Sequence, residues 1–76
     1  MNVKVYSTNT WPWCTKVKDY LRSENIPYVE YNVNQDRAAA MEMVQKSGQS
    51  GVPVIDIDGK IVVGFDKARI DSILGL

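Results

Sequence analysis

Trp11-Pro12-Trp13-Cys14 separates two segments with different hydrophobic periodicity. Before it, residues 3–6 (Val-Lys-Val-Tyr) are β-branched or aromatic at most positions, which predicts a short buried strand. From about Trp13 the apolar spacing becomes helical, and one face holds Trp13, Val17, Tyr20 and Leu21. Pro12 suits the first helical position, because its missing N–H would have no partner there. The tetrapeptide is therefore expected at a turn from a strand into a helix.

The rest of the chain continues the alternation of strands and helices. We expect a strand over 28–33, a helix over 37–46 stopped by Gly48, strands over 53–57 and 60–63 joined by an Asp58-Gly59 turn, and a last helix capped by Asp66. The order βαβαββα predicts an α/β fold: a four-stranded mixed sheet with helices on both faces. We expect residues 1–76 to form a single domain.

The tetrapeptide resembles the Cys-Pro-x-Cys motif of the glutaredoxin branch of the thioredoxin superfamily. The resemblance implies a thioredoxin fold and a thiol–disulfide oxidoreductase in which the first cysteine attacks and the second, here Cys14, resolves the mixed disulfide. A helix N-terminus favours the attacking thiolate. Trp11 stands at that position, and an indole cannot attack a disulfide. The resemblance therefore predicts the fold and the site but an inactive, or nearly inactive, chain.

A second mark is Gly51-Val52-Pro53, which resembles the Val-Pro segment whose cis proline faces the redox motif in this family. That resemblance implies that the backbone of Val52 pairs with a substrate chain in a short β-like ladder. The alternative is a trans proline that simply begins a strand.

The third mark is Gly64-Phe65-Asp66 before the last helix. Glutathione-using glutaredoxins typically carry two glycines and an acidic residue here, and many carry a lysine where this chain has Thr8. Phe65 and Thr8 resemble instead the glutaredoxin-like proteins that a reductase protein reduces. Both donors, glutathione and a protein of the thioredoxin reductase type, stay open. Asp66 has the alternative role of a helix cap, and Trp13 that of either a docking residue or a cover for the helix start.

Three origins of Trp11 are consistent with the sequence. The codon of selenocysteine, UGA, differs by one base from the tryptophan codon UGG, so the parent protein is a candidate selenoprotein. Alternatively the chain is a natural interaction module that has lost its nucleophile, in which two exposed tryptophans form a contact surface. The third origin is a deliberate replacement of cysteine.

The amino-acid composition limits the classes of molecule that we expect this chain to bind. Nine basic and nine acidic side chains cancel, which argues against nucleic acid or anionic membranes as partners. We expect a cytoplasmic monomer that acts on disulfide-containing proteins or small disulfides and holds no bound cofactor. One cysteine and no histidine exclude an internal disulfide and a zinc site of soft ligands. Asp56 and Asp58 are assigned to strand alternation and to the turn, so we expect no metal site.

Overall fold

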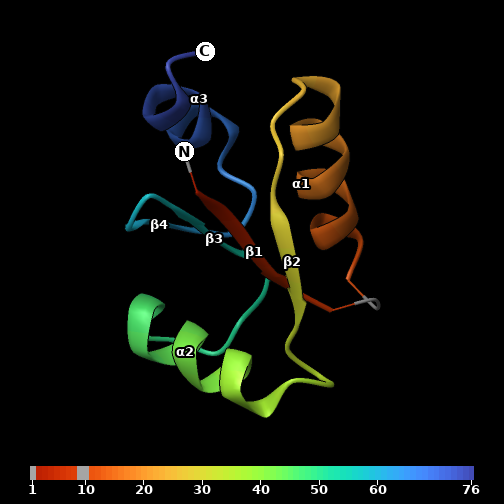
Figure 1. Cartoon of the computed structure of the whole chain (residues 1–76), viewed down its shortest axis with the longest axis vertical. Coiled ribbons are helices and arrows are strands. Elements are labelled where there is room, and N and C mark those ends of the chain that lie inside the picture. The colour runs from red at the N-terminus through yellow and green to blue at the C-terminus, as the bar shows by residue number, and fades with distance from the viewer. Residues whose placement is uncertain (1, 9–10) are drawn as a thin grey trace.

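The computed structural model describes residues 2–8 and 11–76 and confirms the expected order of elements (Figure 1). The elements are β1 (Val3–Ser7), α1 (Pro12–Ser23), β2 (Val29–Asn32), α2 (Arg37–Ser47), β3 (Val54–Ile57), β4 (Lys60–Val63) and α3 (Lys67–Leu74). Where the sequence predicted the first or last residue of an element, that residue agrees with the observed one to within one position. Pro12 opens α1, as its fixed φ and missing N–H favour.

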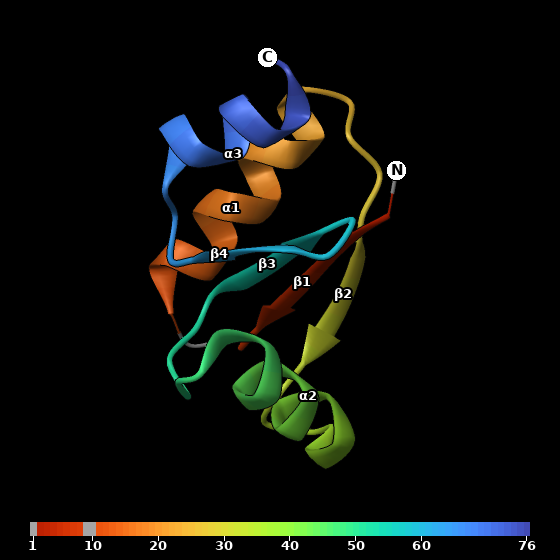
Figure 2. The ribbon, with the colours of Figure 1, turned by 90° about the vertical axis from the view of Figure 1, so that its left-hand side faces the viewer.

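One mixed sheet has the strand order β2-β1-β3-β4. β1 and β2 are parallel, as expected for two strands joined by a helix, and the other two pairings are antiparallel. Figure 2 shows α1 and α3 together on one face of the sheet and α2 on the other. The predicted α/β fold with helices on both faces is confirmed.

Each face of the sheet has its own core. On the side of α1 and α3, Val5 and Ile55 pack with Leu21 and Ile70, while on the side of α2 Tyr6 and Val54 pack with Met43. Neighbouring residues of a strand point to opposite faces, so one buried strand can serve both cores.

One expectation about a helix face was wrong, and a second helix also buries fewer apolar residues than its sequence contains. The buried stripe of α1 is Cys14, Val17 and Leu21, and Trp13 lies outside it with 53% of its surface exposed. In α2 the sheet-facing residues are Ala39 and Met43, so Val44 is 43% exposed. In both helices the stripe that meets the sheet is narrower than the run of apolar residues in the sequence.

The predicted turn and caps are present. Asp58 and Gly59 both have positive φ, at 51° and 90°, as a primed two-residue hairpin turn requires. Gly48 ends α2 in the left-handed conformation, and the carboxylate of Asp36 caps the start of that helix by accepting the Ala39 N–H.

Candidate functional site

The residues singled out by the sequence gather at one end of the sheet. Tyr6 pairs with Val54, and Val54 pairs with Val63. The segments that follow β1 and β4 and the segment that precedes β3 therefore lie at the same end of the sheet. α1 begins a few residues after β1 in the chain, so the tetrapeptide also belongs to this end of the sheet.

Trp11 and Cys14 occupy one turn at the start of α1 but differ completely in exposure. Trp11 is the N-cap residue, with φ −103° and ψ 124°, and its side chain makes no capping hydrogen bond. The Cys14 N–H donates to the Trp11 carbonyl at 3.1 Å. Trp11 is 56% exposed, whereas Cys14 is fully buried. Position 11 thus presents its side chain to solvent at the positive end of a helix dipole.

An open groove of about 260 Å³ connects the three marks of the sequence. Its walls are formed by Trp13, Val52, Pro53, Gly64 and Phe65. The Val52-Pro53 peptide is cis, as the resemblance implied. The Gly64 N–H donates to the Pro53 carbonyl at 2.8 Å, which ties the end of β4 to the start of β3.

Val52 lines this groove and is partly buried. Among the hydrogen bonds between described residues, none uses the Val52 N–H or carbonyl. A backbone N–H and carbonyl without partners in the protein can form hydrogen bonds with an extended segment of a bound substrate chain.

Phe65 is held in place from behind the groove. Its ring lies 5.8 Å from that of Tyr20, centroid to centroid, and it packs against the core under α1 and α3. The Tyr20 hydroxyl donates to Asp71 of α3, and Lys67 donates to the same carboxylate at 2.8 Å. The Asp71 hydrogen bond and burial raise the pKa of Tyr20, so the hydroxyl keeps its proton.

Trp11 and Cys14 are not part of the groove lining, and neither are two of the predicted substrate-binding residues, Asp66 and Thr8. Asp66 caps α3, because its carboxylate accepts the Arg69 N–H at 3.2 Å. Thr8 directly follows β1 and is only 5% exposed. The expected loop between β1 and α1 also includes Asn9 and Thr10, which lie outside the described residues.

Lys16 adds a positive charge beside the groove. Its ammonium lies 4.4 Å from the centroid of the Trp13 ring, within the range of a cation–π contact. The groove therefore has apolar walls and a cation at its rim.

A polar network that the sequence did not predict lies on the α1 side of the sheet. Glu30 of β2 accepts hydrogen bonds from Lys18 of α1 at 2.6 Å and from Ser7 of β1 at 3.1 Å. The sequence holds only part of the signal: Lys18 is four residues after Cys14, so it shares a helix face with that thiol, but its partner on β2 depends on how the two elements pack.

Asp56 lies on the face of the sheet opposite to Ile55 and Ile57, as strand alternation predicts. This face is covered by α2, however, and Asp56 is only 7% exposed. Lys46 of α2 reaches it at 2.6 Å and also donates to Glu42 at 2.9 Å and to the Tyr6 hydroxyl at 3.0 Å. Burial acts to raise the pKa of Asp56, but the bonds from Lys46 and from the Gly59 N–H outweigh it, and the net shift is downward. A single Asp between Ile55 and Ile57 was the signal for a buried ion pair.

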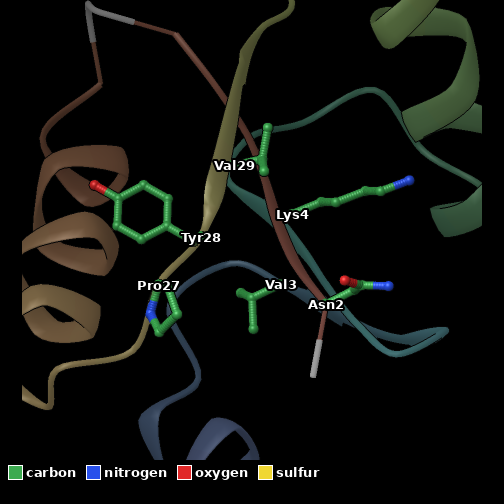
Figure 3. A pocket seen from close by; sticks show the side chains of 6 residues that line it. All are labelled: Asn2, Val3, Lys4, Pro27, Tyr28 and Val29. Atoms are coloured by element: carbon green, nitrogen blue, oxygen red, sulfur yellow. The ribbon is translucent and has the colours of Figure 1, made fainter.

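Another hollow, of about 230 Å³, lies at the opposite end of β1 (Figure 3). Its lining is Asn2, Val3, Lys4, Pro27, Tyr28 and Val29. Figure 3 shows the Lys4 side chain and the Tyr28 ring extending in opposite directions from this hollow. It contains none of the predicted site residues.

Residues 2–8 and 11–76 contain neither a helix that could span a membrane nor a cluster of side chains placed to hold a metal ion. No helix there is long and apolar enough to cross a membrane. In the same part of the chain, no group of three or more His, Cys, Asp or Glu side chains is placed to hold a metal ion.

Comparison with known proteins agrees with this geometry. The glutaredoxin family model matches residues 3–62. A glutaredoxin-like 8.6 kDa protein from the rubredoxin operon of Clostridium pasteurianum is 56% identical over 72 residues, which are 95% of this chain and 96% of that protein. Glutaredoxin 3 of Escherichia coli K12 is 34% identical over 65 residues, covering 86% of this chain and 78% of the relative.

Comparison with solved structures also indicates a thioredoxin-like fold. The crystal structure of a mutant thioredoxin-like protein superposes with a TM-score of 0.92 at 30% identity, covering 97% of this chain and 95% of that one. The family match covers well over half of the chain and reaches from β1 into β4. This chain belongs to the glutaredoxin family and is a glutaredoxin-like redox protein with a thioredoxin fold.

Proposed function

We propose that the parent of this chain is a thiol or selenol–disulfide oxidoreductase whose nucleophile occupies position 11. The observation that carries the proposal is the groove of Trp13, Val52, Pro53, Gly64 and Phe65 beside the start of α1. A side chain at position 11 caps that helix and is exposed. A thiolate there would be accessible and stabilised by the helix N-terminus.

The reaction proceeds in two exchanges. A thiolate or selenolate at position 11 attacks one sulfur of the substrate disulfide, which breaks and releases a thiolate that takes up a proton. The thiol of Cys14 then attacks the atom at position 11 and breaks the mixed disulfide, and its proton passes to the second substrate thiolate as that group leaves. The protein is left with a bond between positions 11 and 14, which an external thiol donor must reduce. The shared turn of these residues makes the second step intramolecular.

Trp11 makes the chain as written inactive in this scheme, because an indole supplies no thiolate. Two of its origins, selenocysteine read or replaced as tryptophan and a deliberate substitution, imply the same parent chemistry. The genomic codon for position 11 distinguishes them: UGA identifies a selenoprotein and a cysteine codon identifies a substitution. A natural UGG codon favours the interaction module described below.

The substrates that fit best are protein disulfides. Val52 offers backbone groups to an extended chain, and Phe65 fills the site where glutathione-using relatives have a second glycine. Glutathione stays the alternative donor, and a protein of the thioredoxin reductase type is the one we favour.

Restoring cysteine tests the proposal. The Trp11→Cys variant is expected to reduce insulin or a glutathione mixed disulfide with either thioredoxin reductase or glutathione as the donor system. Trp11→Ser is the matched control, because it has the small polar side chain without the thiol. A Trp11→Cys variant that is folded by circular dichroism yet reduces neither substrate with either donor overturns the enzyme proposal.

The second candidate is a binding module without catalysis. Trp11 and Trp13 are 56% and 53% exposed, and exposed tryptophans are frequent binding hot spots. This candidate predicts that Trp11→Ala abolishes capture of a partner protein, whereas the enzyme proposal predicts little change in protein contacts.

A further inference from the structure

The segment that carries the redox motif is bracketed by two hydrogen-bond donors that share one acceptor atom. Ser7, the last residue of β1, and Lys18, one turn beyond Cys14 in α1, both donate to Oε2 of Glu30, at 3.1 and 2.6 Å. Residues 8–17 lie between these two donors. One carboxylate oxygen thus connects β1, which precedes the motif, with α1, which contains residues 12–14 of the motif.

Burial differs along this network. Ser7 is fully buried, and the Lys18 side chain is 13% exposed, whereas the Glu30 side chain on the edge strand β2 is 37% exposed. The hydrogen bond from Lys18, followed by that from Ser7, lowers the pKa of Glu30 against the effect of burial. Glu30 is therefore a carboxylate at neutral pH and keeps both donors.

The network adds little to global stability, because β1 and α1 are already fixed by the core through Val5, Val17 and Leu21. An ion pair with a partner this exposed contributes little to the free energy of unfolding. Ser7 is the last residue of β1 and Lys18 follows Val17 in α1, so the network adds a polar connection between these two elements next to position 11 to the contacts of the core.

We propose that Glu30 is a positioning residue: by binding Ser7 and Lys18 together it fixes the first turn of α1, and with it position 11, relative to the groove. The consequence for catalysis rests on the proposed function, but the positioning itself can be measured in the chain as it stands.

The direct readout is the amide of Cys14, whose N–H donates to the Trp11 carbonyl. Glu30→Ala is expected to speed hydrogen exchange of this amide by up to about fivefold, the upper limit for losing an ion pair with an exposed partner from the closed state. Glu30→Gln keeps an acceptor oxygen and should retain most of the protection. The indole resonances of Trp11 and Trp13 provide a second readout, since these are the two tryptophans of the chain.

Glu42→Ala is the matched control. It removes another carboxylate that accepts from a lysine and a hydroxyl, but on the opposite side of the sheet. It should leave the Cys14 amide and both indole resonances unchanged. If Glu30→Ala affects them no more than Glu42→Ala does, the positioning role is wrong.

Activity is tested separately in the Trp11→Cys background. Adding Glu30→Ala should lower kcat/KM about tenfold, because a small displacement of the reacting group is costly, while Glu30→Gln restores most of it. An inactive Trp11→Cys protein would refute the proposed function and leave the exchange measurement to decide the role of Glu30. An unchanged kcat/KM in Glu30→Ala would refute that role in catalysis.

Discussion

The Cys14 N–H donates to the Trp11 carbonyl at 3.1 Å, yet Trp11 is 56% exposed and Cys14 is fully buried. Position 11 is therefore accessible to solvent, whereas the thiol of Cys14, one helical turn further along the chain, is not. In a two-thiol mechanism this is the arrangement that lets the outer residue meet the substrate while the inner one waits for the mixed disulfide.

The burial of Cys14 predicts an unreactive thiol in the folded chain. Treated with Ellman's reagent under native conditions, the protein should show no rapidly reacting thiol, since reaction requires local opening. In guanidinium chloride one thiol per chain should react at once. Complete reaction of the native protein within the mixing time would contradict the buried position of Cys14.

The Lys46–Asp56 ion pair should be important for stability. Lys46→Met leaves Asp56, 7% exposed, without the ammonium that lies 2.6 Å away. Removing one partner of a buried pair costs about 3 kcal/mol in the free energy of unfolding, which urea denaturation followed by circular dichroism measures.

The control for this measurement is the exposed pair of Asp19 and Arg22, at 3.2 Å with both side chains more than 60% exposed. Asp19→Asn should change the free energy of unfolding by less than about 0.5 kcal/mol. Equal effects of the two substitutions would show that burial of the Lys46 pair has no energetic consequence.

The ionised carboxylate of Glu42 contributes to the stability of the folded protein, and this contribution is lost at acidic pH. Hydrogen bonds from Tyr6 and then Lys46 lower its pKa from 4.5 to about 2. A carboxyl group whose pKa is lower in the folded state contributes stability above its unfolded pKa and loses it as pH falls through the folded value. The free energy of unfolding should therefore decrease from about pH 4.5 toward pH 2, and Glu42→Gln should make this decrease shallower. An identical slope in both proteins would refute the contribution of Glu42.

Phe65 is predicted to set the preference between donors. In the Trp11→Cys background, Phe65→Gly removes the ring from the groove wall and should lower the KM for a glutathione mixed disulfide about fivefold, or about 1 kcal/mol of binding. Phe65→Ala is the control, because it removes the ring but keeps Cβ beside the backbone. If neither variant has a lower KM for the glutathione mixed disulfide than the protein with Phe65, the ring does not exclude glutathione.

The sequence predicted the fold because its local signals agree with its tertiary contacts. The change of periodicity around Pro12, the turn at Asp58-Gly59 and the cap at Asp66 each identify an element from neighbouring residues alone. The three motif segments also converge on one groove, as their resemblance to the family implied.

Side-chain networks between distant elements could not be predicted in the same way. The bond from Lys18 to Glu30 depends on how α1 lies against β2, and the pair of Lys46 and Asp56 depends on which face α2 covers. Trp13 shows the same limit, because helical spacing alone did not reveal that the buried stripe of α1 runs through Cys14.

The most direct test of the central claim, that position 11 is the site of attack, is mass spectrometry of a trapped mixed disulfide. The double variant Trp11→Cys and Cys14→Ser, incubated with oxidised glutathione, is expected to gain one glutathione at position 11. The chain as written, with Cys14 as its single thiol, should gain none while folded. Modification of Cys14 in the folded chain, together with an unmodified position 11 in the double variant, would contradict this assignment of the nucleophile.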